Sequence, residues 1–416
     1  MRGKILAAGT VLCALSLAAG VQGAELKCCK AAGAVPDCLK SCIDMHKAQT
    51  GRFLRVREGL LDQDDTNTLS LSAPEGMETV TVWQAADEGD HYCNGVCVVK
   101  FKDRLFCQWQ SSQTDEDAPD THICYAVSED GGKTWGEARR LPADIDGGYC
   151  SSGGWLNTGD TLVAYINFWP SDISPRGGYT YCVTTEDGEN WSEVQQVKMA
   201  DDTPLDAIFE QDPHILANGR IVNAAHFQAG LTVSPIYTDD KTGIGGWHRA
   251  QIAATDKGDT SREMEPSIFE QDDGTLTMIF RDQDSSFTKR AAVSKDNGET
   301  WSEIFATAVP DARTKQSGGN LSDGTAFMVG SPVNNKLRSP LAILLSQNGR
   351  YFDRAYLLRS GDSDPEVVYE GKAKRKGFHY AKSYVCDGRV YVGYATNKEA
   401  VEITVIPEDS LKSTDK

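Results

Sequence analysis

Apolar residues occur along most of the chain in short runs that are separated by polar pairs. For example, Val96–Val99 and Leu105–Cys107 flank the pair Lys102-Asp103, and the arm Thr275–Phe280 follows Asp273-Gly274. Short apolar or alternating arms on either side of a polar turn predict β-hairpins. Six such hairpins are expected, and their turns lie at Lys102-Asp103, Thr158-Gly159, Asn218-Gly219, Asp273-Gly274, Asp323-Gly324 and Asp387-Gly388.

A second repeated feature is a polar turn that ends in an aromatic residue, hereafter the Asp-box. It reads Ser-Glu-Asp-Gly-Gly-Lys-Thr-Trp at 128–135 and Ser-Lys-Asp-Asn-Gly-Glu-Thr-Trp at 294–301, with degenerate copies at 185–191 and 346–352 and a looser copy at 238–247. In such a turn the Ser and Asp side chains bond to nearby amides, Gly takes the positive φ, and the aromatic ring packs between sheets. The copies start 52 to 57 residues apart.

Four-stranded units that repeat radially at this period form a β-propeller. The sequence therefore predicts an all-β protein whose residues 76–416 are a six-bladed β-propeller, with one hairpin per blade. The segment after about residue 395 and the stretch Thr79–Trp83 are both strand-like and could share the closing blade. Seven blades are the alternative. The cysteine-rich segment 24–75 does not fit the repeat and is expected to be a small disulfide-tied extension packed on the propeller.

The first residues predict an export signal. Arg2 and Lys4 supply positive charge, residues 5–20 form an apolar stretch without charge, and small residues precede Ala24. This order is typical of a cleaved signal peptide over residues 1–23, so a secreted or periplasmic protein is expected. An uncleaved anchor is the alternative. No later segment reaches the roughly 18 uninterrupted apolar residues of a membrane span.

The 12 cysteines bear on the same question. In an exported protein they favour disulfides, whose connectivity stays open, and the odd number left after removal of Cys13 implies a free thiol or an intermolecular bridge. A zinc site formed by the four N-terminal cysteines is the alternative, although no histidine lies at the spacing of a zinc finger. These four are Cys28, Cys29, Cys38 and Cys42, and the others are Cys93, Cys97, Cys107, Cys124, Cys150, Cys182 and Cys386.

The net charge of the chain is −18, and loss of Arg2 and Lys4 with the signal would make it −20. Such a charge argues against nucleic acid or an anionic membrane as the partner. An anionic substrate would be repelled by the field of the whole protein. Its attraction would have to come from a few arginines that are concentrated in a pocket.

Hairpin geometry predicts which side chains meet. In an antiparallel pair, residues equally far from the turn lie side by side. Glu265 and Arg281 are each eight positions from Asp273 and are therefore expected at the open end of one hairpin. If the blades are radial, these ends surround the axis and form a polar pocket. The other expected pairs are Gln211 with His226, Tyr380 with Ala395, Gly95 with Gln110, and Ser151 or Ser152 with Asn167.

Together with the Asp-boxes, the order Glu265, Arg281, Arg338, Tyr380 resembles the sialidase (neuraminidase) superfamily over roughly residues 80–410. The resemblance implies that Tyr380 attacks the anomeric carbon and Glu265 takes its proton, while Arg281 and Arg338 hold a carboxylate. These roles suit the residue types, because a phenol needs an adjacent base to act as a nucleophile and planar guanidinium groups match carboxylates. Further predicted substrate-binding residues are Gln110, Glu116, Gln211 and His226.

Two stretches depart from the family pattern. Sialidases usually carry Arg-Ile-Pro near the inner strand of the first blade, where this chain has His91–Gly95, and an acidic Asp after the first hairpin, where it has Gln108–Gln110. Residues Asp115, Glu116 and Asp117 follow and could replace that acid. His91, this acidic cluster and the run Asn397-Lys398-Glu399 together resemble the pattern of a divergent branch of bacterial sialidase-like propellers. Related propellers include lyases that act on uronic-acid glycans, in which a His or Tyr removes the C5 proton.

The sequence thus predicts an exo-acting glycosidase that releases a terminal acidic sugar, sialic acid first, with Tyr380, Glu265 and His91 as catalytic residues. One alternative is a lyase that cleaves a uronate polysaccharide by β-elimination, with His91, His226 or Tyr380 as the base. Another is a non-catalytic glycan-binding propeller. The expected partner is a sialoglycoconjugate or a uronate polysaccharide. The acidic runs lack the spacing of an EF-hand, and neither a metal nor a cofactor is expected. A monomer is expected.

Overall fold

The computed structural model describes residues 54–253 and 264–412. The predicted signal peptide, the four N-terminal cysteines and most of the predicted extension lie outside the described residues. Within these ranges the protein is all-β, with 29 strands and two short 3-10 helices, Gly361–Ser363 and Glu408–Leu411. None of the helices in these ranges has the length and apolar character needed to cross a membrane.

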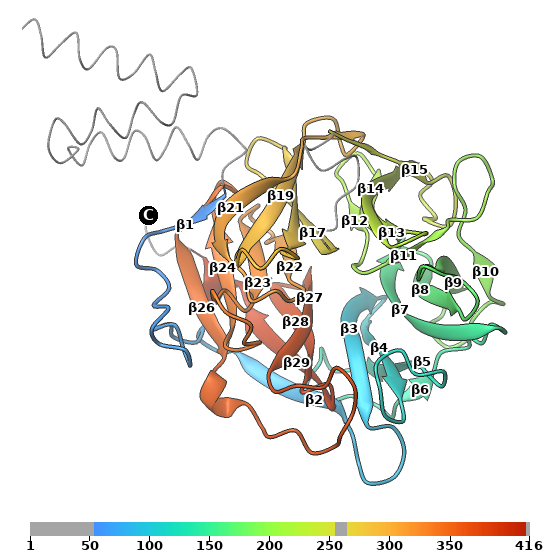
Figure 1. Cartoon of the computed structure of the whole chain (residues 1–416), viewed down its shortest axis with the longest axis horizontal. Helices are drawn as coiled ribbons and strands as arrows, with labels where there is room; N and C mark the ends of the chain where they lie inside the picture. The colour runs from blue at the N-terminus through green and yellow to red at the C-terminus, as the bar shows by residue number, and fades with distance from the viewer. Residues whose placement is uncertain (1–53, 254–263, 413–416) are drawn as a thin grey trace, which may run out of the picture. The chain divides into compact units, whose positions relative to one another are not determined.

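The strands form sheets that follow one another around a common centre, which gives a propeller-like fold (Figure 1). The first sheet contains β3 (Tyr92–Phe101), β4 (Arg104–Ser112), β5 (His122–Ser128) and β6 (Arg139–Arg140). The second contains β7 (Gly148–Asn157), β8 (Leu162–Pro170), β9 (Tyr179–Thr185) and β10 (Gln195–Gln196). The third contains β11 (Ala207–Phe209), β12 (His214–Ile215), β13 (Ile221–Phe227), β14 (Thr232–Thr238) and β15 (His248–Arg249).

The second half of the described chain continues the same pattern. The fourth sheet contains β17 (Met264–Glu270), β18 (Leu276–Arg281), β19 (Thr288–Ser294) and β21 (Phe305–Pro310), extended by β1 (Arg55–Val56) and β25 (Tyr351–Phe352). The fifth contains β22 (Ser317–Asn320), β23 (Ala326–Gly330), β24 (Leu341–Ser346) and β26 (Arg354–Arg359). The sixth contains β27 (Phe378–Cys386), β28 (Arg389–Thr396), β29 (Ala400–Pro407) and β2 (Glu78–Gln84), and β16 (Gln251–Ile252) pairs with β20 (Thr300–Trp301).

The sixth sheet joins the two ends of the described chain. Strand β2 pairs antiparallel with β29, so that Thr79 lies opposite Thr404 and Val80 opposite Ile403. Because β2 continues along the chain into β3 of the first sheet, this pairing joins the last sheet to the first. The prediction that Thr79–Trp83 and the C-terminal strand share one sheet is confirmed.

The Asp-boxes lie where the sequence predicts turns, and each begins at the last residue of the third strand in one of the first five sheets. In the copy at 294–301, the Ser294 hydroxyl accepts the Gly298 amide at 3.0 Å and Asp296 accepts the Thr300 amide at 2.9 Å. Gly298 has φ +87°, and a Cβ there would approach Val222 to 3.1 Å. Trp301 is buried. The box is therefore a self-bonded turn that anchors an aromatic ring between sheets.

The hydrophobic core lies between neighbouring sheets. Phe106 of β4 meets Trp155 of β7 edge to face, with ring centroids 6.2 Å apart. Tyr165 of β8 and Phe209 of β11 make a similar contact at 5.0 Å between the second and third sheets. Aromatic pairs of this geometry add to the free energy gained by burial, and they fix how each sheet sits against the next.

The prediction of disulfide bonds is wrong for the described residues. The seven cysteines from Cys93 to Cys386 are all free thiols, and five of them are buried. Burial raises the pKa of the Cys97 thiol to about 12 and that of Cys182 to about 12. These side chains act as small apolar core residues in the described ranges.

The expected hairpin registers are displaced by one residue in three of the hairpins. Arg281 lies opposite Met264, Ala395 opposite His379, and Gln110 opposite Asn94. The cause is a β-bulge in each inner strand, at 264–267 in β17, 379–382 in β27 and 94–97 in β3. The pair Ser151 and Asn167 is confirmed.

The third sheet departs further from the expected pairing. His226 lies opposite Ile208 rather than Gln211, because the inner strand is broken between β11 and β12. Gln211 falls in this break. Its side chain donates to the Gln316 carbonyl at 2.7 Å instead of pairing beside His226 in the ladder.

Candidate functional site

Glu265 and Tyr380 occupy the bulges of β17 and β27, on two non-adjacent sheets. Both have positive φ, +56° for Glu265 and +55° for Tyr380. Left-handed backbone costs a non-glycine residue about 1–3 kcal/mol and concentrates at functional sites, where bulges redirect side chains. The bulges turn these two side chains out of the ladder and toward the axis.

Arg281 connects the two. Its Nη1 donates to Glu265 Oε2 at 2.8 Å and to the Tyr380 hydroxyl at 3.4 Å. Burial, followed by the carboxylates of Glu265 and Glu116, raises the pKa of Tyr380, against the opposing charges of Arg281 and Arg338. The predicted meeting of Glu265, Arg281 and Tyr380 is present in the structure.

Arg338 lies on the other side of the phenol, with its Cζ 5.1 Å from the centre of the Tyr380 ring. Its Nη1 lies 2.6 Å from His379 Nδ1, and His379 Nε2 lies 2.8 Å from the Arg375 carbonyl oxygen. Because a carbonyl only accepts, the His379 proton sits on Nε2 and Nδ1 accepts from Arg338. Burial and then the charge of Arg338 lower the pKa of His379 well below its usual value, so the ring is neutral.

Arg375 brings a third guanidinium to the site, and sequence reasoning missed it. Its pKa is lowered first by the charge of Arg338, then by burial, and also by Arg281, while Tyr380 opposes the shift. Arg375 is therefore coupled electrostatically to Arg338 and Arg281. The chain supplies Arg375 from the segment before β27, and no motif marks it.

A fourth cation faces the same phenol. Lys398 Nζ lies 5.4 Å from the centre of the Tyr380 ring and forms an ion pair of 2.8 Å with Glu116 Oε1. Glu116 Oε1 also accepts from the Tyr92 hydroxyl at 3.1 Å and from Asn94 at 3.3 Å. Of the predicted substrate-binding residues, Glu116 is thus held within the cluster.

An ion pair between a buried lysine and a partly buried glutamate lies near the phenol. Lys315 Nζ is 2.9 Å from Glu210 Oε2 and 5.6 Å from the centre of the Tyr380 ring. His226 Nε2 accepts the Glu265 amide at 3.3 Å, and burial lowers the pKa of His226, so the neutral ring supports the Glu265 bulge. His226 lies where the sequence predicts it, although its contact is to the backbone.

The three consecutive acidic residues go to different partners. Asp115 accepts the Lys372 amide, and Asp117 forms two bonds with Arg176, at 2.8 and 2.7 Å. Glu116 alone among these three contacts Lys398. The sequence analysis left open which of the three replaces the missing acid but predicted Glu116 as a substrate-binding residue, and Glu116 is the one that contacts Lys398 beside Tyr380.

His91 does not join the cluster. Its ring stacks on Tyr369 with centroids 4.0 Å apart, and its carbonyl accepts Lys374 Nζ at 2.6 Å. Within residues 54–253 and 264–412, no recorded contact links it to Glu265 or Tyr380. The predicted catalytic role of His91 lacks structural support, because the segment before β27 packs over its ring.

The remaining two predicted residues, Gln110 and Gln211, lie at the edges of the cluster around Tyr380. Gln110 lies beside Gly95, since a Cβ on that glycine would come within 3.3 Å of Gln110 Oε1. Gln211 donates to the Gln316 carbonyl at 2.7 Å, and Gln316 donates in turn to the Glu265 carbonyl at 3.1 Å. Gln211 therefore supports the floor under Glu265.

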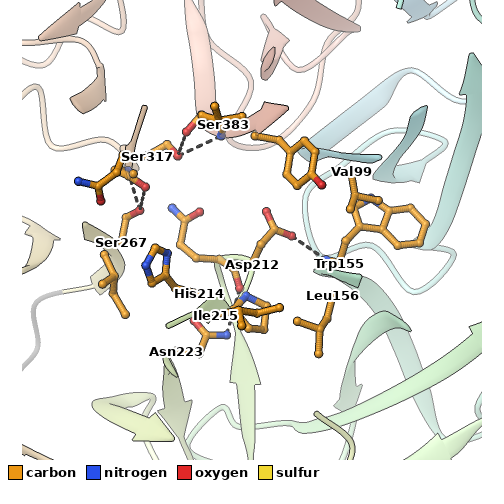
Figure 2. Close-up of a pocket in the computed structure, with 18 of the residues that line it drawn as sticks. Val99, Trp155, Leu156, Asp212, His214, Ile215, Asn223, Ser267, Ser317 and Ser383 are labelled. Carbon is orange, nitrogen blue, oxygen red and sulfur yellow. Dashed lines mark hydrogen bonds between the residues drawn. The ribbon is translucent and has the colours of Figure 1, made fainter. Parts of the chain in front are cut away.

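An axial cavity of about 400 Å³ lies further along the same inner strands, beyond this floor. Figure 2 shows Asp212 pointing into it and the hydroxyls of Ser317 and Ser383, 2.6 Å apart, joining two neighbouring inner strands. Asp212 accepts the Trp155 amide at 2.6 Å. Neither Glu265 nor Tyr380 lines this cavity, so it is separate from the cluster around the phenol.

The comparisons with known proteins agree with this architecture. A family model described as the BNR repeat-like domain matches residues 103–392. The chain belongs to this family. Several of the solved structures that share its fold are named sialidases, so the expected sialidase-like BNR-repeat propeller is confirmed at the level of the fold. No match is found among curated proteins.

Three solved structures illustrate the likeness. A Dyadobacter fermentans protein of unknown function is 15% identical, with a TM-score of 0.60, over 80% of this chain and 99% of that one. The Hadza microbial sialidase Hz136 is 16% identical, with a TM-score of 0.63, over 80% and 69%. The Ruminococcus gnavus intramolecular trans-sialidase in complex with oseltamivir carboxylate is 14% identical, with a TM-score of 0.56, over 82% and 99%. At such low sequence identities, the comparisons show that this chain shares the fold of these three structures.

Proposed function

We propose that this BNR repeat-like protein is a secreted, exo-acting glycoside hydrolase that releases a terminal acidic sugar, sialic acid first, from glycans. The observation that carries the proposal is the contact of Glu265, Arg281 and Tyr380, which come from two separate sheets. A phenol is a weak nucleophile unless a base lies beside it. Glu265 is the base, Tyr380 the nucleophile, and water hydrolyses the resulting glycosyl-tyrosine.

The charge balance of the site supports an anionic substrate. Five cations surround Tyr380, and three carboxylates accompany them, which leaves an excess of two positive charges in a protein of net charge −18. Arg281, Arg338 and Arg375 form a clamp for a carboxylate, since planar guanidinium groups bind carboxylates in fixed geometry. The cations are Arg281, Arg338, Arg375, Lys315 and Lys398, and the carboxylates are Glu116, Glu210 and Glu265.

The architecture of the whole chain is part of the proposal. The six larger sheets correspond to six blades of a propeller over residues 76–416, with seven blades as the alternative count. A signal peptide over 1–23 and a cysteine-rich extension over 24–75 precede it. Strand β1, near the end of that extension, pairs with β21 and β25, which supports packing of this part on the propeller.

The test compares the purified protein with its Tyr380→Phe variant on an α-linked sialyl disaccharide. The variant keeps the ring but loses the nucleophile, so release of free sialic acid should fall by at least about 10³-fold. Tyr391→Phe is the matched control, because the Tyr391 hydroxyl bonds to the Gly131 carbonyl at 3.3 Å, in the Asp-box at 128–135. This control should keep the wild-type rate.

The alternatives give different signals in the same preparation. A lyase would produce an unsaturated uronate that absorbs ultraviolet light from a uronate polysaccharide. A glycan-binding protein would bind sialylated glycans without turnover. Either result, or sugar release that survives Tyr380→Phe, would reject the hydrolase with a tyrosine nucleophile.

A further inference from the structure

The Lys398 ammonium occupies an unusual position beside the phenol. The residue lies in the turn between β28 and β29, where Asn397 and Lys398 both have positive φ, +57° and +62°. Its side chain is 1% exposed. The ammonium lies 5.4 Å from the ring centre of Tyr380 and 5.5 Å from that of Tyr92. A strained turn therefore delivers a buried cation to the reacting group.

Its partner carboxylate is fixed in place by several contacts. Three donors converge on Glu116 Oε1, namely Lys398, the Tyr92 hydroxyl and Asn94. Because these contacts hold the carboxylate, Glu116 fixes where the Lys398 ammonium points.

Lys398 also differs from an ordinary surface lysine in its acidity. Burial lowers its pKa, the charges of Arg338 and Arg375 act in the same direction, and Glu116 opposes them. A general acid is most effective when its pKa approaches the working pH.

We propose that Lys398 is the general acid and base of this site, and that Glu116 is its positioning partner. The inference deepens the proposed function and rests on it. In the first step Lys398 gives a proton to the glycosidic oxygen as the bond to the anomeric carbon breaks, and the aglycone leaves as an alcohol. The Tyr380 oxygen bonds to the anomeric carbon, and its proton passes to Glu265.

The second step restores every group. Water attacks the anomeric carbon and gives its proton to the neutral Lys398 amine. The bond between the sugar and Tyr380 breaks, and Glu265 returns the proton to the phenolate. The free sugar leaves, and no other reactant is needed.

Lys398→Arg provides the sharpest test. Arginine keeps the positive charge and can pair with Glu116, but it does not release a proton in proteins. An alcohol leaving group needs protonation, whereas 4-nitrophenol leaves readily as its anion. The variant should therefore lose kcat/KM, which reports the first step and not the second step that both substrates share, about 10²- to 10³-fold more on the sialyl disaccharide than on the 4-nitrophenyl sialoside. The alkaline limb of the wild-type pH profile on the disaccharide should also disappear.

Two further variants control for folding and charge. Lys100→Arg changes a lysine that pairs with Asp387 at 2.6 Å near the outer turns of β3 and β28, away from the phenol, and should keep the wild-type ratio. The double variant Lys398→Met with Glu116→Gln removes both charges, so no unpaired buried ion remains. It should show the same selective loss as Lys398→Arg, with thermal unfolding measured for both proteins.

The outcomes separate the two proposals. An equal loss on both substrates would overturn the role of Lys398 in proton transfer and leave the hydrolase intact. A wild-type protein that releases no sugar from either substrate would overturn the hydrolase, and the role of Lys398 with it. A selective loss on the disaccharide supports both.

Discussion

The ion pair of Lys315 and Glu210 allows a quantitative test of how the site is held together. The Lys315 side chain is 3% exposed and that of Glu210 is 28% exposed, and the charged atoms are 2.9 Å apart. At an effective dielectric constant of about 20, their attraction is on the order of 6 kcal/mol. Lys315→Met removes the cation and leaves the carboxylate without its partner, close to Glu265.

The net cost is smaller than the gross attraction, because the ammonium no longer has to be desolvated. Breaking a buried pair from one side typically costs about 3–5 kcal/mol. Glu210 can regain some water through its exposed part, so the lower end, about 3 kcal/mol, is expected. For a domain of this size that corresponds to a fall of roughly 6 °C in the thermal unfolding midpoint.

The assay compares Lys315→Met with Lys376→Met, whose partner Glu366 lies 2.7 Å away on the surface. An exposed pair contributes at most about 1 kcal/mol, so Lys376→Met should shift the midpoint little. Adding Glu210→Gln to Lys315→Met should restore part of the loss. Equal shifts for the two lysine variants, or no recovery in the double variant, would refute the reasoning.

Two other predictions concern stability. Burial favours the neutral acid, but the charge of Lys315 holds the pKa of Glu210 below its ordinary value of 4.5. A depressed pKa stabilises the fold above that value, and the stabilisation is lost as the pH falls below it. The difference in unfolding midpoint between wild type and Glu210→Gln should therefore be constant above about pH 4.5 and shrink below it, and a constant difference at all pH values would contradict this. Trp301 is buried and bonds to the Gly298 carbonyl at 3.0 Å, so Trp301→Ala should cost about 3–5 kcal/mol in urea unfolding, whereas Val368→Ala, at a side chain 72% exposed, should stay within about 0.5 kcal/mol.

Features of the fold that depend on residues close together in the sequence could be predicted, whereas some details of strand pairing could not. The Asp-box at 294–301 was predictable because its bonds join residues at most four positions apart. The hairpin that carries Glu265 and Arg281 was predictable for a similar reason, since Asp273-Gly274 marks its turn. The one-residue displacement of the strand register in three hairpins could not be predicted, because a bulge leaves no signature in the alternation of apolar residues.

Some residues of the site could likewise be predicted from the sequence, and others could not. Glu265, Arg281, Arg338 and Tyr380 could be proposed from their order along the chain, and the structure brings them together. Arg375 and Lys398 join the site because the loop before β27 and the turn after β28 fold toward the axis. For His91, the same loop covers the ring with Tyr369 and removes it from the cluster.

The sequence by itself determined the repeating unit, its turns and the aromatic anchors, because each of these depends on contacts within a few residues. The tertiary structure alone decided which charges share the axis. Asp115, Glu116 and Asp117 are adjacent in sequence, yet they bond to Lys372, Lys398 and Arg176, respectively. Such choices depend on partners that lie tens to hundreds of residues away, and the electrostatic energy of a pair is defined only when the fold has set the distance between its members.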